Sequence, residues 1–174
     1  MKFNTDEKIN QTKNTFFNRS LGAFVGFAIG DAFGATTEFM TKKEIEMKYK
    51  KLKDIIGKGW LNIKQGSVTD DTHMSIALGE SIIESGEFSP FNVAEYFVKW
   101  MKSRPIDIGN TIRLSLINYM KSGKIESNYD ENSAGNGALM RVIPICIYAK
   151  DDLNALLEMS IRQAHITHNN NLSD

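Results

Sequence analysis

Two adjacent carboxylates, Asp70 and Asp71, follow Thr69 in the stretch GSVTDDTHM at residues 66–74. Carboxylate and hydroxyl oxygens are hard ligands, of the kind that Mg²⁺ and Mn²⁺ bind in proteins. Neighbouring ionised carboxylates repel each other unless a cation or several hydrogen-bond donors compensate their charge. An acidic helix start explains the same residues, because Thr69 or an aspartate can cap a helix whose dipole favours negative charge. This stretch alone leaves both interpretations open.

A glycine-containing stretch, SAGNGALMR at residues 133–141, is the second candidate for chemistry. The glycines on either side of Asn136 permit a close approach of the backbone to a ligand. A helix expected over 137–149 would direct its first N–H groups at a phosphate, and Arg141 would add a fork of donors. A flexible loop that caps a helix is the alternative. The stretch is not a P-loop, because no Gly-Lys-Ser/Thr follows it.

Isolated polar residues add weaker candidates. Glu38 follows an apolar, glycine-containing segment and is a candidate general base or ligand anchor, although a solvated acid at a helix end explains it equally well. Asp107 can likewise be a helix cap. His165 and His168 are spaced to share a helix face, but no third ligand at a suitable spacing supports a zinc site. Surface or stacking histidines are therefore the expectation.

Helical periodicity dominates the elements that must position these residues. Apolar residues at i, i+3 and i+4 predict a helix over 14–38, in which glycines recur at every fourth position. We expect residues 16–37 to form a largely buried central helix, with neighbouring helices close to the glycine face. Thr41 with Glu44 has the spacing of a capping box, and Ser89 before Pro90 is a typical helix start. Further helices are predicted over 41–51, about 70–85, from Ser89 onward, 107–123, 137–149 and 151–166.

Composition limits the class of protein. The chain has 174 residues, enough for one domain, with 21 basic and 21 acidic residues, and this balance argues against a nucleic-acid partner. Cys146 is the single cysteine and lies in an apolar run, which predicts a buried, inert thiol in a reducing compartment. No signal sequence or membrane span is visible, so we expect a cytoplasmic protein without a membrane partner. Residues 1–13 are interpreted as a polar N-terminal segment and 14–174 as one helical domain.

Five stretches together resemble one family, the ADP-ribosylglycohydrolases, which include the dinitrogenase-reductase-activating glycohydrolases. Each is a weak signal alone, but all five occur in the family's order over nearly the whole chain. They are GFAIGDAFGATTE (26–38), GSVTDDTHM (66–74), PIDIGNT (105–111), GNGALMRVIP (136–144) and ITHNN (166–170). The resemblance implies an all-α, orthogonal multi-helix bundle that holds a pair of Mg²⁺ or Mn²⁺ ions. It also implies cleavage of the bond between ADP-ribose and arginine, serine or another acceptor.

The resemblance assigns roles to individual residues. Thr69, Asp70 and Asp71 match the first group of metal ligands in the family. Glu38 matches an acidic residue near the metals, and Asp107 matches an aspartate near the scissile ribose, so both are expected to be catalytic. The residues that match the ADP-ribose cleft are Asn136, Gly137, Met140, Arg141 and His168. The expected partner is an ADP-ribosylated protein or a small molecule that contains ADP-ribose.

One part of the family pattern is missing. Family members are longer, and a later Asp-x-Asp-Thr/Ser motif supplies their other metal ligands, whereas this sequence contains no Asp-x-Asp. The resemblance therefore implies a truncated N-terminal portion with an incomplete cation site. Two alternatives to an intact hydrolase follow. One is a degenerate relative that binds ADP-ribose or has a structural role, and the other is half of a split enzyme completed by a C-terminal chain.

Overall fold

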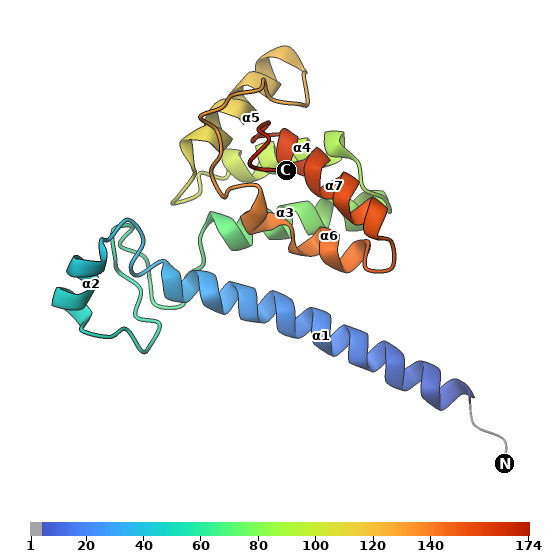
Figure 1. Cartoon of the computed structure of the whole chain (residues 1–174), viewed down its shortest axis with the longest axis horizontal. Coiled ribbons are helices and arrows are strands. Elements are labelled where there is room, and N and C mark those ends of the chain that lie inside the picture. The colour runs from blue at the N-terminus through green and yellow to red at the C-terminus, as the bar shows by residue number, and fades with distance from the viewer. Residues whose placement is uncertain (1–4) are drawn as a thin grey trace.

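The structure, a computed structural model, describes residues 5–174, with side chains from residue 15 onward. Within this range it contains α-helices, one 3-10 turn and no strand, which confirms the all-α prediction. The helices are α1 (Thr5–Gly34), α2 (Lys42–Tyr49), α3 (Asp70–Ser85), α4 (Pro90–Lys102), α5 (Asn110–Ser122), α6 (Ile143–Tyr148) and α7 (Leu153–His165). Figure 1 shows α3 to α7 gathered into one body, with α1 running along its side and α2 beyond the C-terminal end of α1.

Local sequence signals account for most helix ends. The Thr41 hydroxyl and the Glu44 carboxylate form the predicted capping box at the start of α2. The Ser89 hydroxyl accepts a hydrogen bond from the backbone of Asn92 at the start of α4. Helices α3 and α5 end at Gly86 and Gly123, both left-handed, as glycine allows without steric cost. The stop at Gly123 also fixes where the loop that leads to Asn136 begins.

The core lies between α3 and α4. Helix α3 packs against α4, α6 and the 3-10 turn at Leu139–Arg141, and α4 packs against α5 and α7. The large apolar side chains with no exposed surface at this centre are Met74, Leu78, Val93, Phe97, Leu116, Ile145 and Ile166. Burying a side chain of this size contributes about 1.5–3 kcal/mol, so these contacts hold the start of α3 in place.

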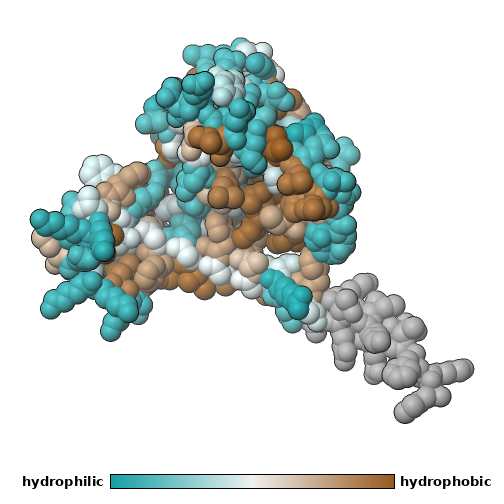
Figure 2. All heavy atoms as spheres, viewed as in Figure 1, coloured by the Kyte–Doolittle hydropathy of each residue, from teal (hydrophilic) through white to brown (hydrophobic). Residues whose placement is uncertain are grey.

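Helix α1 departs from the prediction. The segment is helical, but residues 16–37 do not form a buried central helix. Side chains at four-residue spacing are exposed along it: Phe17 by 62%, Leu21 by 51%, Val25 by 49%, Ile29 by 54% and Phe33 by 36%. The periodicity of a sequence identifies the apolar face of a helix but does not identify the segment that covers it. In this structure α1 contacts mainly α3 and α6, and these contacts leave the apolar face exposed. Figure 2 shows the apolar surface along α1.

The glycine face of α1 is open as well. A Cβ atom built on Gly22, Gly26, Gly30 or Gly34 meets no other atom within 4 Å, so the expected close approach of neighbouring helices is not observed. The helix also begins earlier than predicted, at Thr5. The boundary drawn between residues 13 and 14 therefore falls inside α1, and residues 1–4 lie outside the described part of the chain.

Two predictions near residue 140 were wrong. The helix expected over 137–149 is divided into the 3-10 turn and the short α6, because Pro144 has no N–H and its ring clashes with the carbonyl one turn earlier. Cys146, expected to be buried, is exposed, since α6 turns Pro144 and Ile145 toward the core instead. No helix among residues 5–174 is long and apolar enough to cross a membrane.

Candidate functional site

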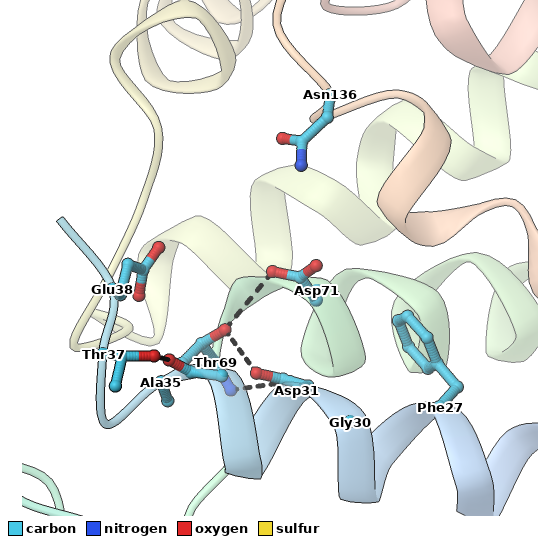
Figure 3. Close-up of a pocket in the computed structure, with 10 residues that line it drawn as sticks. Phe27, Gly30, Asp31, Ala35, Thr37, Glu38, Thr69, Asp71 and Asn136 are labelled. Atoms are coloured by element: carbon cyan, nitrogen blue, oxygen red, sulfur yellow. Dashed lines mark hydrogen bonds between the residues drawn. The ribbon is translucent and has the colours of Figure 1, made fainter. Parts of the chain in front are cut away.

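Two adjoining cavities form a cleft between the C-terminal end of α1, the start of α3 and the loop before the 3-10 turn. Their volumes are about 500 and 260 Å³, and Glu38, Asp71 and Asn136 line both. Figure 3 shows these three side chains around the same space, each from a different segment. Asp70, Asp107 and His168 line the smaller cavity only. We call this the acidic cleft, because carboxylates dominate its polar lining.

Thr69, at the start of α3, is held by a residue that sequence reasoning missed. Thr69 occupies the N-cap position, but its hydroxyl does not cap the helix. It donates to Asp31 Oδ1 at 2.7 Å, and the Thr69 backbone N–H donates to Asp31 Oδ2 at 2.9 Å (Figure 3). Thr72 adds a backbone hydrogen bond to Asp31 Oδ2 at 3.2 Å and a hydroxyl hydrogen bond at 2.5 Å. Asp31 therefore joins α1 to the start of α3.

The contact with Asp31 also orients the Thr69 hydroxyl. A hydroxyl group has one hydrogen, so when Thr69 donates it to Asp31 only lone pairs remain for other partners. Asp71 Oδ2 lies 3.4 Å from the same hydroxyl oxygen. The available signal in the sequence was a lone acid inside an apolar helical segment, and it carried no indication of this partner 38 residues away.

The acids of the cleft raise one another's pKa values. Burial, and then the charges of Asp107, Asp70 and Asp71, raise the pKa of Glu38 to about 7. Burial, followed by Asp107 and Asp71, raises the pKa of Asp70 to about 6. The pKa of Asp71 is raised by burial and by Asp31. Glu38, Asp70, Asp71 and Asp107 therefore lie close enough for their negative charges to repel one another. A bound cation would relieve this repulsion.

The fit to a metal ion is partial. Carboxylate and hydroxyl oxygens are the ligands that Mg²⁺ and Mn²⁺ prefer, and the lone pairs of Thr69 are available. However, among the residues whose side chains are described, no group of three or more His, Cys, Asp or Glu is arranged to hold a metal ion. These residues therefore have the donor chemistry of one wall of a cation site and not a complete coordination shell.

Residues 135–137, which we call the glycine loop, line the cleft on the side opposite the start of α3 (Figure 3). Asn136, Gly137 and Met140 line the smaller cavity together with His168, and all four are residues that the family resemblance assigned to a ligand cleft. A Cβ atom on Gly137 would lie 2.6 Å from Cε1 of His168, so only glycine permits this packing of ring against backbone. No helix of the predicted length follows the loop in the described part of the chain. The helix start that was expected to direct its N–H groups at a phosphate is therefore not formed there.

Arg141 lies outside the cleft, contrary to the prediction. Its side chain is fully buried, and its guanidinium stacks 4.4 Å above the Phe97 ring. It donates to the Gln163 side chain at 2.7 Å, to the Gln163 carbonyl at 2.9 Å and to the Thr167 hydroxyl at 2.8 Å. Gln163 of α7 and Thr167, just after α7, accept from the donors that sequence reasoning had assigned to a ligand. Burial lowers the pKa of Arg141 to about 9, with Asp70 opposing that shift.

The remaining histidines are accounted for locally. His165 Nε2 lies 2.8 Å from Asp174, and His73 is exposed on α3. Neither residue lines the acidic cleft.

Comparison with known proteins adds relatives to this geometry. The chain is 46% identical over 157 residues to an ADP-ribosyl-[dinitrogen reductase] glycohydrolase of Rhodospirillum rubrum, which covers 90% of this chain and 53% of that protein. It is 32% identical to the ADP-ribosylarginine hydrolase Tri1 of Pseudomonas putida, over 91% of this chain and 43% of that one. The chain spans about half the length of these relatives.

A solved structure and a family model agree with these relatives. An ADP-ribosylglycohydrolase-related protein complex superposes with a TM-score of 0.77 at 32% identity, over 89% of this chain and 50% of that one. The model of the ADP-ribosylglycohydrolase family matches residues 12–173. The chain with the acidic cleft therefore belongs to the ADP-ribosylglycohydrolase family.

Proposed function

We propose that the acidic cleft is one wall of a metal-dependent hydrolase site that removes ADP-ribose from a modified protein side chain. The observation that carries the proposal is the position of Glu38, which lines one cavity together with Asp70, Asp71 and Asp107. Burial and the charges of these aspartates raise the pKa of Glu38 to about 7. The relatives support the same reaction, because their names describe removal of ADP-ribose from dinitrogen reductase and from arginine.

The raised pKa suits Glu38 to proton transfer near neutral pH, where a general base is most effective. In the proposed reaction a water oxygen bonds to the anomeric carbon of ADP-ribose while the bond to the protein side chain breaks. Glu38 takes the proton that the water loses, and this proton then passes to the leaving nitrogen or oxygen, so that one water molecule is divided between the two products. Asp107, across the smaller cavity, would hold the ribose hydroxyls or the leaving group.

Thr69, Asp70 and Asp71 would hold Mg²⁺ or Mn²⁺ from the α3 side of the cleft. When bound, such a cation stabilises developing negative charge and orients hydroxyl groups and water. The chain's own contribution is the fixed start of α3, which Asp31 secures through Thr69 and Thr72. Asn136 and Gly137 would line the opposite side and accommodate the ligand close to the backbone.

The test is release of ADP-ribose from a peptide carrying ADP-ribosylarginine, with Mn²⁺ present. The chain alone should turn over slowly, because its cation ligands form one wall only. Adding the portion of the Rhodospirillum rubrum relative that this chain does not match should accelerate turnover. Glu38→Gln in this chain should then lower the rate by roughly 10²–10⁴-fold. An Asp71→Asn variant that hydrolyses as fast as the unaltered chain in the same mixture would contradict the proposal.

A second candidate function is binding of ADP-ribose without hydrolysis. The observation that favours it is the incomplete metal-ligand set among the described side chains. The two candidates differ in one result of the same experiment. A binding protein would retain ADP-ribose but release none from the peptide, even after the portion of the Rhodospirillum rubrum relative that this chain does not match is supplied.

A further inference from the structure

His168 is buried at the edge of the acidic cleft, and one of its ring nitrogens has a fixed partner. The residue is 3% exposed, and its Nδ1 lies 2.8 Å from the Thr167 hydroxyl oxygen. Its other nitrogen, Nε2, has no hydrogen-bond partner among the described residues. A Cβ atom on Gly137 would lie 2.9 Å from Nε2, and one on Gly135 would lie 3.6 Å from it. The Nε2 edge therefore faces the glycine loop that lines the cleft.

The Thr167 hydroxyl determines which ring nitrogen carries the hydrogen. Arg141 Nη2 donates to the Thr167 oxygen at 2.8 Å, and a guanidinium cannot accept a hydrogen bond. If His168 Nδ1 also donated to that oxygen, the single hydroxyl hydrogen would be left without an acceptor in a residue that is 1% exposed. Burying an unpaired hydroxyl hydrogen is unfavourable. The hydroxyl therefore donates to Nδ1, and the ring hydrogen resides on Nε2.

We propose that Thr167, held by Arg141, fixes the neutral His168 ring as the Nε2–H tautomer, so that the cleft presents one hydrogen-bond donor of fixed position to an acceptor atom of the ADP-ribosyl ligand. Thr167 and Arg141 are positioning residues, since both act through His168. The ligand part of this inference rests on the proposed function, whereas the tautomer follows from the hydrogen bonds of the chain alone.

The acidic residues around His168 explain why a neutral donor suits this position. Glu38, Asp70, Asp71 and Asp107 fill the same cavity with acceptors, and these carboxylates repel the phosphate oxygens of a nucleotide. A neutral N–H group at a fixed position recognises an acceptor without adding to that repulsion. Burial, and then the charge of Arg141, lowers the pKa of His168 to about 4, which keeps the ring neutral at physiological pH.

Nitrogen NMR of the histidine rings in the full chain, at neutral pH and without ligand, tests the tautomer. The chain has three histidines, so His168→Gln identifies the signals of this ring. The expected pattern is a protonated Nε2 and an unprotonated Nδ1. Thr167→Val, which lacks the hydroxyl, should give a mixture of tautomers, while Thr167→Ser should retain the original pattern. A ring protonated at Nδ1, or a Thr167→Val spectrum unchanged from the unaltered chain, would overturn the proposal.

Calorimetric titration with ADP-ribose and Mn²⁺ tests the ligand part. Thr167→Val should bind ADP-ribose about tenfold more weakly, as expected for loss of one well-placed hydrogen bond, and Thr167→Ser should bind as the unaltered chain does. Equal affinity of Thr167→Val and the unaltered chain would overturn the ligand part. If the unaltered chain itself fails to bind ADP-ribose, the proposed function and the ligand part both fall, and the spectra still decide the tautomer.

Discussion

The Asp31 carboxylate of α1 accepts hydrogen bonds from both the backbone N–H and the hydroxyl of Thr69, at 2.9 and 2.7 Å. The same carboxylate accepts from Thr72, so one side chain fixes the first turn of α3. The position of Asp70 and Asp71 in the cleft thus depends on a residue that precedes them by one helix and a long loop.

Asp31→Asn should weaken both the fold and the cation site. An amide presents donors to partners that themselves donate, and leaving buried hydroxyl groups unpaired costs roughly 1–3 kcal/mol of unfolding free energy. Urea denaturation would measure this loss, and Mn²⁺ titration would show a lower affinity. Asp54→Asn, at an exposed position in the loop after α2, is the matched control. Equal stability and Mn²⁺ affinity in Asp31→Asn and the unaltered chain would contradict the positioning role.

Glu38 should make stability depend on pH. Its pKa rises from 4.5 to about 7 on folding, so the folded state binds its proton more tightly. The contribution to stability is fully present below pH 4.5 and is lost as the pH rises through about 7. Glu38→Gln cannot ionise, so its melting temperature relative to the unaltered chain should increase between pH 5 and pH 8 by an amount that thermal denaturation can resolve.

Glu87→Gln, at an exposed position outside the cleft, is the control for that series. A melting-temperature difference between Glu38→Gln and the unaltered chain that stays constant across this pH range would show that the carboxylates of the cleft do not repel Glu38.

Gly59 should be intolerant of any side chain. Its φ is +63°, and a Cβ atom would lie 2.6 Å from the Thr36 carbonyl oxygen, just before Glu38. Gly66 has a φ of +79° but no atom within 4 Å, so it isolates the cost of the left-handed backbone. We predict that Gly66→Ala lowers the free energy of unfolding by about 1–2 kcal/mol. Gly59→Ala should lower it by a further amount of about 1–3 kcal/mol, because the added methyl group overpacks the site. Equal losses of unfolding free energy in the two variants, measured by urea denaturation, would show that Gly59 does not pack closely against the backbone of residues 35–36.

The exposed face of α1 should cause self-association. Phe17, Leu21, Val25, Ile29 and Phe33 recur every fourth residue and form a contiguous apolar ridge, of a kind that usually contacts another molecule or segment. Light scattering after size-exclusion chromatography should give a mass above that of one chain. Replacing Leu21 and Val25 with Gln should reduce the mass, and the control Ile83→Gln, on exposed α3 surface, should not. A wild-type chain that is monomeric at high concentration would contradict this prediction.

Local signals in the sequence were sufficient for several elements. Helix α3 begins and ends where its acidic start and Gly86 predict, and Ser89 with Pro90 marks the start of α4. These helix ends are encoded within a few residues of one another, so no knowledge of tertiary packing is needed. The residues gathered in the cleft, from Glu38 to His168, were assigned to one site by the family resemblance, because their local signals left other interpretations open.

Features that depend on tertiary partners were missed. Asp31 could not be distinguished from a solvated acid, because its partners lie 38 and 41 residues away. Arg141 has donors that suit a phosphate, but Gln163 and Thr167 of the folded chain take them instead. The apolar period of α1 gave the face correctly, whereas its exposure depends on which other helices are present to cover it.

The most direct test of the cleft is calorimetric titration of ADP-ribose into the chain, with and without Mn²⁺, for the unaltered protein and for Asp71→Asn. Asp71 lines both cavities and is one of the proposed metal ligands. We expect binding that strengthens when Mn²⁺ is added, and we expect Asp71→Asn to abolish this strengthening. Binding of equal strength with and without Mn²⁺, unchanged in Asp71→Asn, would contradict this expectation.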